Sequence, residues 1–191
     1  MVTTRNTRKD VVEAAGRLFA LRGYHGTSMR DLGKELGLLG SSLYSHVDSK
    51  QDLLVEVVEE GARLFEASAE RALRAGGSPR EQLRALVGGH VDVVLDNLDV
   101  ARTYLNEARM LDDQHRSRIL DARDHYEGVF RGVLAEGSGD GSFRPGLDPK
   151  TTAIFILSIL NAIERWYDPK GRLDRAALVG ELSSFVLAAV R

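Results

Sequence analysis

Cysteine is absent from this chain of 191 residues, which excludes a disulfide framework and any metal site built from cysteine ligands. No apolar run reaches the roughly 18–20 residues that a membrane-spanning helix needs. The first residues lead into an amphipathic pattern, whereas a secretory signal peptide would contain an apolar core. We therefore expect a soluble, cytoplasmic protein with no membrane contact.

The chain also lacks the excess of positive charge that would by itself indicate a nucleic-acid-binding protein, because its formal net charge is −2. The charge is nevertheless unevenly distributed. Residues 1–50 contain eight Lys and Arg against five Asp and Glu, and the rest of the chain contains 18 against 23. A basic N-terminal segment followed by an acidic remainder is typical of a DNA-binding domain joined to a second domain.

Apolar residues recur with helical spacing along nearly the whole chain, and no stretch alternates as a β-strand would. The glycine- and serine-rich residues 137–142 are expected to form a loop. The predicted fold is all-α, with about nine helices: a three-helix, helix-turn-helix domain at 1–50 and a helical-bundle body at 51–191. Beyond a short second helix, we expect helices at about residues 8–22, 39–46, 49–75, 79–96, 99–110, 113–136, 149–167 and 174–190.

Local signals mark the ends of the first helices. Gly23 is placed to stop the first helix. Thr27 or Ser28 can cap the second, and Asp31 follows Ser28 at the spacing of a capping box. Gly37 ends this helix after about two turns.

The third helix carries side chains suited to the DNA major groove, which are short and can hydrogen-bond to base edges. Leu43 and Val47 recur on its opposite side, toward the supporting helices. Hydroxyl groups and a lysine at neighbouring helix N-termini can hold phosphates. The alternative is that residues 39–46 only pack within a plain three-helix bundle. The predicted DNA-binding residues are Thr27, Ser28, Gly40, Ser41, Ser42, Tyr44, Ser45, His46 and Lys50.

Between residues 11 and 54, several short stretches follow one another in a distinctive order and at distinctive spacings. They include Gly23-Tyr24, Gly26-Thr27-Ser28-Met29-Arg30-Asp31-Leu32, Glu35-Leu36-Gly37-Leu38 and Ser42-Leu43-Tyr44-Ser45-His46-Val47. The segment closely resembles the TetR family of transcriptional regulators. The resemblance implies a homodimeric repressor on a two-fold symmetric, double-stranded DNA operator, with phosphate contacts at Thr27, Tyr44 and Lys50. Leu39 replaces the usual capping hydroxyl of that family, which implies an unusual operator or a flexible recognition helix.

The second half of the chain contains Asn161, then Arg165-Trp166-Tyr167, and then Pro169, Gly171 and Leu173. This stretch resembles TetR-type regulators that respond to acyl-CoA thioesters, which implies an apolar or acyl-CoA effector. The alternative is that Trp166 and Tyr167 pack at a dimer interface. The aromatic residues of 99–133 have helical spacing, which is more often that of an ordinary core than of a pocket. The predicted effector pocket contains Tyr104, Arg109, Tyr126, Phe130, Asn161, Arg165 and Trp166.

Two further features of the sequence concern assembly and activity: apolar stripes along helices, and the absence of catalytic motifs. Apolar stripes that include Ile154, Leu160, Leu178 and Phe185 suit a four-helix dimer interface. There is no Gly-x-Ser-x-Gly elbow, and the 137–142 stretch lacks the Gly-Lys-Ser/Thr ending of a phosphate loop, so we expect no enzyme, metal or cofactor. The predicted function is a ligand-released repressor. The alternatives are a helical protein-interaction module with a non-functional DNA-binding domain, or a transcriptional activator.

Overall fold

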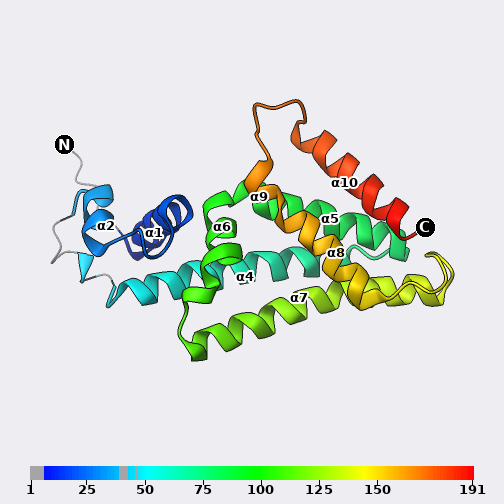
Figure 1. Cartoon of the computed structure of the whole chain (residues 1–191), viewed down its shortest axis with the longest axis horizontal. Coiled ribbons are helices and arrows are strands. Elements are labelled where there is room, and N and C mark those ends of the chain that lie inside the picture. The colour runs from blue at the N-terminus through cyan, green and yellow to red at the C-terminus, as the bar shows by residue number, and fades with distance from the viewer. Residues whose placement is uncertain (1–6, 39–42, 46) are drawn as a thin grey trace. The chain divides into compact units, whose positions relative to one another are not determined.

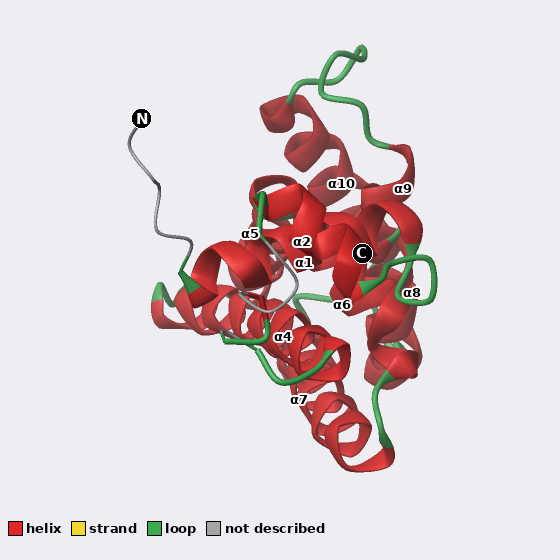
Figure 2. Cartoon of the chain, turned by 90° about the vertical axis from the view of Figure 1, so that its left-hand side faces the viewer, coloured by secondary structure: helices red, strands yellow, loops and turns green. Residues whose placement is uncertain are grey.

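The computed structural model describes residues 7–38, 43–45 and 47–191 (Figure 1). Over this part of the chain every regular element is helical, as Figure 2 shows, which confirms the all-α prediction. Among the described helices, none has both the length and the apolarity that crossing a bilayer requires. The elements are α1 (Arg8–Arg22), α2 (Met29–Leu36), α4 (Lys50–Arg74), α5 (Pro79–Asp96), α6 (Leu98–Glu107), the 3₁₀ helix η1 (Ala108–Met110), α7 (Asp113–Gly139), α8 (Pro149–Asn161), α9 (Ile163–Trp166) and α10 (Arg175–Ala189).

The ends of α1 and α2 form where the local signals predict. Gly23 closes α1 at a φ of 74°, and Gly37 closes α2 at a φ of 65°, which are backbone conformations that glycine adopts without strain. Ser28 caps α2 by accepting a hydrogen bond from the Asp31 amide, and the Asp31 carboxylate accepts one from the Ser28 amide at 2.9 Å. The predicted capping box is therefore confirmed.

The predicted loop at 137–142 is wrong over its first three residues, because α7 continues to Gly139. The glycine at position 137 serves close packing instead of a turn. A Cβ atom on Gly137 would overlap the ring of Phe143, whose amide donates to the Gly137 carbonyl at 2.8 Å. The predicted helix at 149–167 is also interrupted, since α8 ends at Asn161 and the short α9 follows.

The chain divides into two compact units. The first unit contains the described residues of Met1–Arg63 together with Asn97–Leu120, and the second contains Leu64–Asp96 and Asp121–Arg191. Helices α4 and α7 each contribute residues to both units. The N-terminal helices therefore share a unit with α6 and η1, which lie far away in sequence.

The first unit is built around the packing of α1 against α2 and α6. Phe19 and Leu32 are fully buried between these helices. Thr103 of α6 is also buried, and its hydroxyl donates to the Gly16 carbonyl of α1 at 3.3 Å. Gly61 of α4 allows close approach to α6, because a Cβ there would lie 2.6 Å from the Cβ of Tyr104. These contacts place α6 directly against the N-terminal helices.

The second unit is organised around α5, which packs against α8, α9 and α10. Its core is apolar, and fully buried side chains include Leu83, Leu86, Phe130 and Leu160. Pro79 begins α5 at the predicted helix start, and Asp148, which the sequence analysis did not single out, caps α8 by accepting from the Thr151 amide at 3.1 Å. Burial of this apolar surface is the main force that stabilises the unit.

Candidate functional site

The segment after α2 presents an apolar side inward and a polar side outward. Leu43 and Val47 are 0% and 2% exposed, whereas Tyr44 is 55% exposed and Ser45 is also exposed. The Val47 amide donates to the Leu43 carbonyl at 3.3 Å, which is the spacing of a helical turn. The inward placement of Leu43 and Val47 is therefore confirmed. Four further residues predicted to bind DNA, Gly40, Ser41, Ser42 and His46, lie outside the described residues, as does Leu39.

Ser28 lies exposed at the N-terminus of α2, as its predicted role requires. The hydrogen bonds from the side chain and the amide of Ser28 lower the pKa of Asp31. Asp31 is therefore an anion at the same helix end where a phosphate would bind. A phosphate at Ser28 would have to approach beside this carboxylate.

Thr27 does not lie where a phosphate-binding side chain is expected. Its side chain is 1% exposed, and its hydroxyl donates to the backbone carbonyls of Gly23 at 3.0 Å and Leu18 at 3.2 Å. The hydroxyl thus holds the turn between α1 and α2 against the end of α1. A direct phosphate contact by this hydroxyl would require it to leave both carbonyls.

Lys50 also has partners within the protein. Its ammonium donates to the carbonyls of Tyr24 at 3.0 Å and Thr27 at 2.9 Å, and it lies 4.1 Å from the centroid of the Tyr24 ring. The sequence predicted a charge available to DNA phosphates. In the structure the same charge holds the α1–α2 turn, with an added cation–π contact to the ring.

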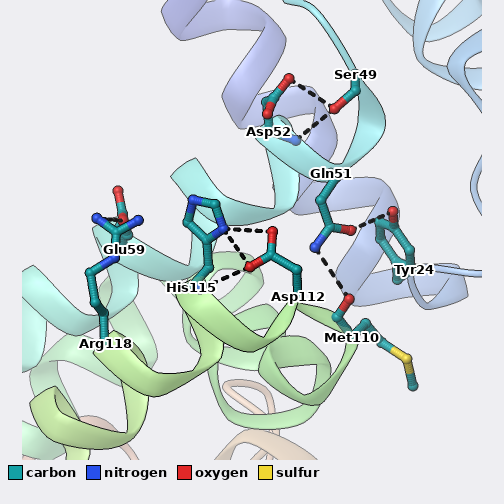
Figure 3. Close-up of polar contacts among 9 residues, drawn as sticks. All are labelled: Tyr24, Ser49, Gln51, Asp52, Glu59, Met110, Asp112, His115 and Arg118. Carbon is teal, nitrogen blue, oxygen red and sulfur yellow. Dashed lines mark hydrogen bonds and ion pairs between the residues drawn. The ribbon is translucent and has the colours of Figure 1, made fainter.

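Tyr24 and Gln51 have structural roles that the sequence did not indicate (Figure 3). The Tyr24 hydroxyl donates to Gln51 Oε1 at 2.8 Å, and Gln51 Nε2 donates to the Met110 carbonyl at 3.3 Å. The Tyr24 amide donates to Glu107 Oε2 at 3.1 Å. Burial raises the pKa of Tyr24 above its usual value. The only advance signal was the position of Tyr24 in the turn after Gly23.

Two of the predicted effector residues, Tyr126 and Phe130, lie together in the core of the second unit. Their ring centroids are 5.5 Å apart, and Phe65 lies 5.5 Å from Tyr126. His90, which the sequence did not single out, lies 4.8 Å from Phe65, and its Nδ1 is 3.1 Å from the Tyr126 hydroxyl. Burial lowers the pKa of His90 to about 3, partly opposed by the Leu160 carbonyl, so the imidazole is neutral. We call these four residues the aromatic cluster.

Other residues of the predicted pocket lie at the junction of α8 and α9. Asn161 is half-buried, whereas Arg165 and Trp166 are exposed, Trp166 to 53%. Glu164 is buried, and its Oε1 lies 3.9 Å from Nε of Arg165, so the guanidinium has a carboxylate partner within the protein. The exposed surface of α9 therefore includes a guanidinium that is paired with a carboxylate, and an indole ring whose centroid lies 6.3 Å from that of Tyr167.

Tyr104 and Arg109, the remaining predicted pocket residues, belong to the first unit. Tyr104 is buried against Gly61, and Arg109 is exposed in η1. The structure thus brings Tyr126 and Phe130 into one cluster and places Asn161, Arg165 and Trp166 at one helix junction. A single pocket that joins all seven stays a prediction.

The predicted dimer stripes are only partly exposed on α8 and α10. Ile154 and Phe185 are exposed, together with Phe155, which the prediction did not include. Leu160 and Leu178, in contrast, are buried within this chain, because both helices pack against α5. The apolar surface free for a second copy is therefore the outer side of α8 and α10.

Family models match two separate parts of the chain. Residues 11–57 match the model described as bacterial regulatory proteins, tetR family, and residues 76–190 match the tetracyclin repressor-like C-terminal domain. A curated relative, the HTH-type transcriptional repressor KstR2 of Mycolicibacterium smegmatis, is 28% identical over 184 residues, covering 96% of this chain and 90% of its own length.

Solved structures resemble the chain over nearly its whole length. The ketosteroid transcriptional regulator KstR2 of Mycobacterium tuberculosis has a TM-score of 0.90 and 28% identity, and the match covers 100% of this chain and 96% of that one. AibR in complex with isovaleryl coenzyme A and operator DNA has a TM-score of 0.84 and 26% identity, with 96% and 97% covered.

Proposed function

The chain belongs to the TetR family of bacterial regulatory proteins and is a DNA-binding transcriptional regulator, and from that premise we propose that it is a repressor released by a small molecule. Residues 1–50 form the DNA-binding domain in this proposal, and residues 51–191 bind the effector and the second copy. As a dimer, two such domains enter successive major grooves about 34–36 Å apart on an operator of two-fold symmetry.

The observation that carries the DNA-binding role is the two-sided segment after α2. Leu43 and Val47 anchor it in the core of the first unit, and Tyr44 and Ser45 extend from its other side. A segment held this way can enter a groove without exposing its apolar residues. The geometry assigns Thr27 and Lys50 to holding the turn before α2, so their phosphate contacts are the least supported of the predicted set.

The DNA-binding proposal is tested with the purified protein and the DNA upstream of its own gene, in a gel-shift series at stated salt concentrations. We expect a site bound at least about 1,000-fold more tightly than bulk DNA. Tyr44→Phe should weaken binding to all duplexes alike, by about fivefold, because it removes one hydrogen bond to a phosphate. Ser117→Ala, which removes an exposed hydroxyl from α7, is the control and should leave the affinity for DNA unchanged. Binding of the site and of bulk DNA with equal affinity would contradict the proposal.

Direction of regulation is tested by placing the upstream region ahead of a reporter gene, with and without this protein. Expression should fall when the protein is present, and an increase would identify an activator. We expect the protein to act in the cytoplasm and to have no enzymatic activity, which the regulator family supports.

We further propose that the effector is an acyl-CoA thioester or a similar molecule with an apolar body. The exposed Arg165 and Trp166 on α9 offer contacts to phosphate and adenine groups, and the aromatic cluster supplies an apolar environment for the acyl part. Support also comes from AibR, which was solved with isovaleryl coenzyme A.

The effector proposal is tested by adding isovaleryl-CoA, free coenzyme A or a free fatty acid to the protein–DNA complex. We expect thioesters to release DNA and to raise the melting temperature, and free coenzyme A to do neither at the same concentration. Arg165→Ala should reduce the response about tenfold or more, because it removes a charged contact. Lys170→Ala in the following loop is a control for the loss of one positive charge. Equal responses to all three compounds would exclude a specific thioester site.

A further inference from the structure

The aromatic cluster of the second unit encloses an imidazole ring between three helices. Phe65 comes from α4 and His90 from α5, and the other two rings come from α7. The centroid of the His90 ring lies 4.8 Å from that of Phe65 and 6.0 Å from that of Tyr126. His90 is only 1% exposed. Two polar nitrogen atoms are thus buried where the neighbouring side chains are mainly apolar.

The two nitrogens of this imidazole have different surroundings. Nδ1 lies 3.1 Å from the Tyr126 hydroxyl, which is within hydrogen-bond distance. Nε2 is buried and has no hydrogen-bond partner among the residues that the structure describes. The Leu160 carbonyl of α8 partly opposes the lowering of the His90 pKa, but it does not complete a hydrogen bond with Nε2. An unsatisfied polar atom in a core costs stability, so this one is a candidate for binding a ligand.

We assign the proton of the neutral imidazole to Nε2. Burial lowers the pKa of His90 to about 3, so at neutral pH the ring has one N–H and one lone pair. A phenol is a better donor than acceptor, so the Tyr126 hydroxyl donates to the Nδ1 lone pair. The N–H is then on Nε2, and the influence of the Leu160 carbonyl, which favours an N–H on the ring, agrees with this assignment. Nε2 is therefore a donor that no described acceptor satisfies.

The partner that suits this donor is an uncharged acceptor oxygen. Phe65, Phe130 and Leu160 are buried and apolar, so a carboxylate among them would lose its hydration without a compensating charge. A carbonyl group loses far less on leaving water and accepts a hydrogen bond in the plane of its substituents. A buried water molecule typically makes about three hydrogen bonds, and the phenyl rings offer it none. The cluster therefore fits an apolar chain that carries a carbonyl group.

We propose that His90 is a specificity-determining residue whose Nε2–H donates to the carbonyl oxygen of the effector's acyl group, and that Tyr126 is a positioning residue that keeps the proton on Nε2. The inference rests on the proposed function and adds the chemistry by which the body distinguishes a thioester from a saturated chain. The donor is already shielded from water in the free protein, so an incoming carbonyl gains a hydrogen bond without displacing water from it. A ligand that lacks an acceptor leaves the Nε2–H unpaired.

The first experiment compares isovaleryl-CoA with S-isopentyl-CoA, in which a CH₂ group replaces the carbonyl, by isothermal titration calorimetry on the full-length protein without DNA. The wild type should bind the thioester about tenfold more tightly, the effect of one hydrogen bond from a buried donor. His90→Phe keeps an aromatic ring but removes both nitrogens, and it should reduce this ratio to less than about twofold. His125→Phe, which replaces an exposed imidazole of α7, is the matched control and should keep the wild-type ratio.

The second experiment observes the proton directly, by ¹⁵N NMR of the full-length protein labelled at its five histidines. The signals of His90 are those that disappear in His90→Phe. In the free wild type the proton should be on Nε2, and isovaleryl-CoA should shift its resonance downfield, whereas S-isopentyl-CoA should not. Tyr126→Phe should distribute the proton over both nitrogens. A tyrosine that only filled space in the core would leave the position of the proton unchanged.

A further pair of probes, 2-octanone and octane, separates the inference from the proposed effector. If neither CoA compound binds but 2-octanone shifts the Nε2–H resonance and octane does not, the acyl-CoA proposal fails and the role of His90 stands. If isovaleryl-CoA releases the operator without a shift at His90, the proposed function stands and the inference is overturned.

Three other results would also overturn the inference. They are a proton on Nδ1 in the free wild type, equal affinities of the wild type for the thioester and the thioether, and no shift of the Nε2–H resonance with either isovaleryl-CoA or 2-octanone. If His90→Phe does not fold, His90→Gln identifies the His90 signals, and the measurements on the wild type decide.

Discussion

Different kinds of interaction stabilise each of the two units of this regulator internally. In the first unit, long-range hydrogen bonds converge on a turn, with Lys50, Gln51 and Glu107 all directed to Tyr24. In the second, long-range polar contacts lie mostly at helix ends, such as the pair of Arg175 with Asp96. The interior of the second unit is an aromatic and aliphatic core.

This difference suits the roles that we propose for the two units. Hydrogen bonds depend on direction, so they fix the geometry of the turn that precedes α2 and the segment proposed to contact DNA. Apolar contacts depend little on direction, so a core of this kind can repack around a ligand at lower cost. His90 and Tyr126 are an exception, since they form a buried polar pair within the apolar core.

The largest loss of stability is expected when a large side chain is removed from the core of the second unit. Phe130 is fully buried, so Phe130→Ala should lower the free energy of unfolding by about 3–5 kcal/mol. Urea unfolding followed by circular dichroism measures the loss. Leu21→Ala, at an exposed leucine of α1, should change it by less than about 0.5 kcal/mol. A small effect at Phe130 would mean that the aromatic cluster does not hold the body together.

The second prediction concerns how the free energy of unfolding depends on acid pH through the titration of His90. Its pKa is about 3 in the folded protein and about 6.5 when unfolded, so the unfolded state takes up the proton first. The stability contribution is intact above about pH 6.5 and declines as the pH falls toward 3, by about 1.4 kcal/mol per pH unit.

His90→Gln, which is neutral at every pH, tests this assignment. The variant should be less stable at neutral pH, but the slope of its unfolding free energy between pH 6 and 4 should decrease by about one proton. Hydrogen exchange should locate the change in the second unit. An identical slope in both proteins would show that other groups control the acid response.

The smallest expected effect concerns a polar contact of the first unit. Ser28→Ala removes the cap of α2 and should lower the free energy of unfolding by about 1 kcal/mol. Exchange of the α2 amides should increase, while that of the α5 amides stays constant. Ser28→Thr, which keeps the hydroxyl, should recover most of the loss. If Ser28→Ala alters both units equally, the first unit does not respond independently.

Helix positions could be predicted because their signals are local. The Ser28 cap, the Gly23 and Gly37 ends and the Pro79 start each depend on a few neighbouring residues. The error at Gly137 has the opposite cause. Glycine usually indicates a turn, but this one makes room for the ring of Phe143, a contact that local patterns do not reveal.

The candidate site was harder to predict for the same reason. The phosphate contact of Lys50 stays a prediction, but its two carbonyl partners, more than 20 residues away in sequence, could not be predicted from local patterns. The role of His90 likewise depends on Phe65 and Tyr126, which come from two other helices. Residue type indicates what a side chain can bind, whereas the fold decides which partner reaches it.

Lys50 and Gln51 are consecutive residues, so they point in directions about 100° apart around the axis of α4. Both nevertheless contact Tyr24, one over its ring and the other at its hydroxyl. Two contacts made from different directions around one helix fix the rotation of α4 relative to Tyr24, which a single contact could not do.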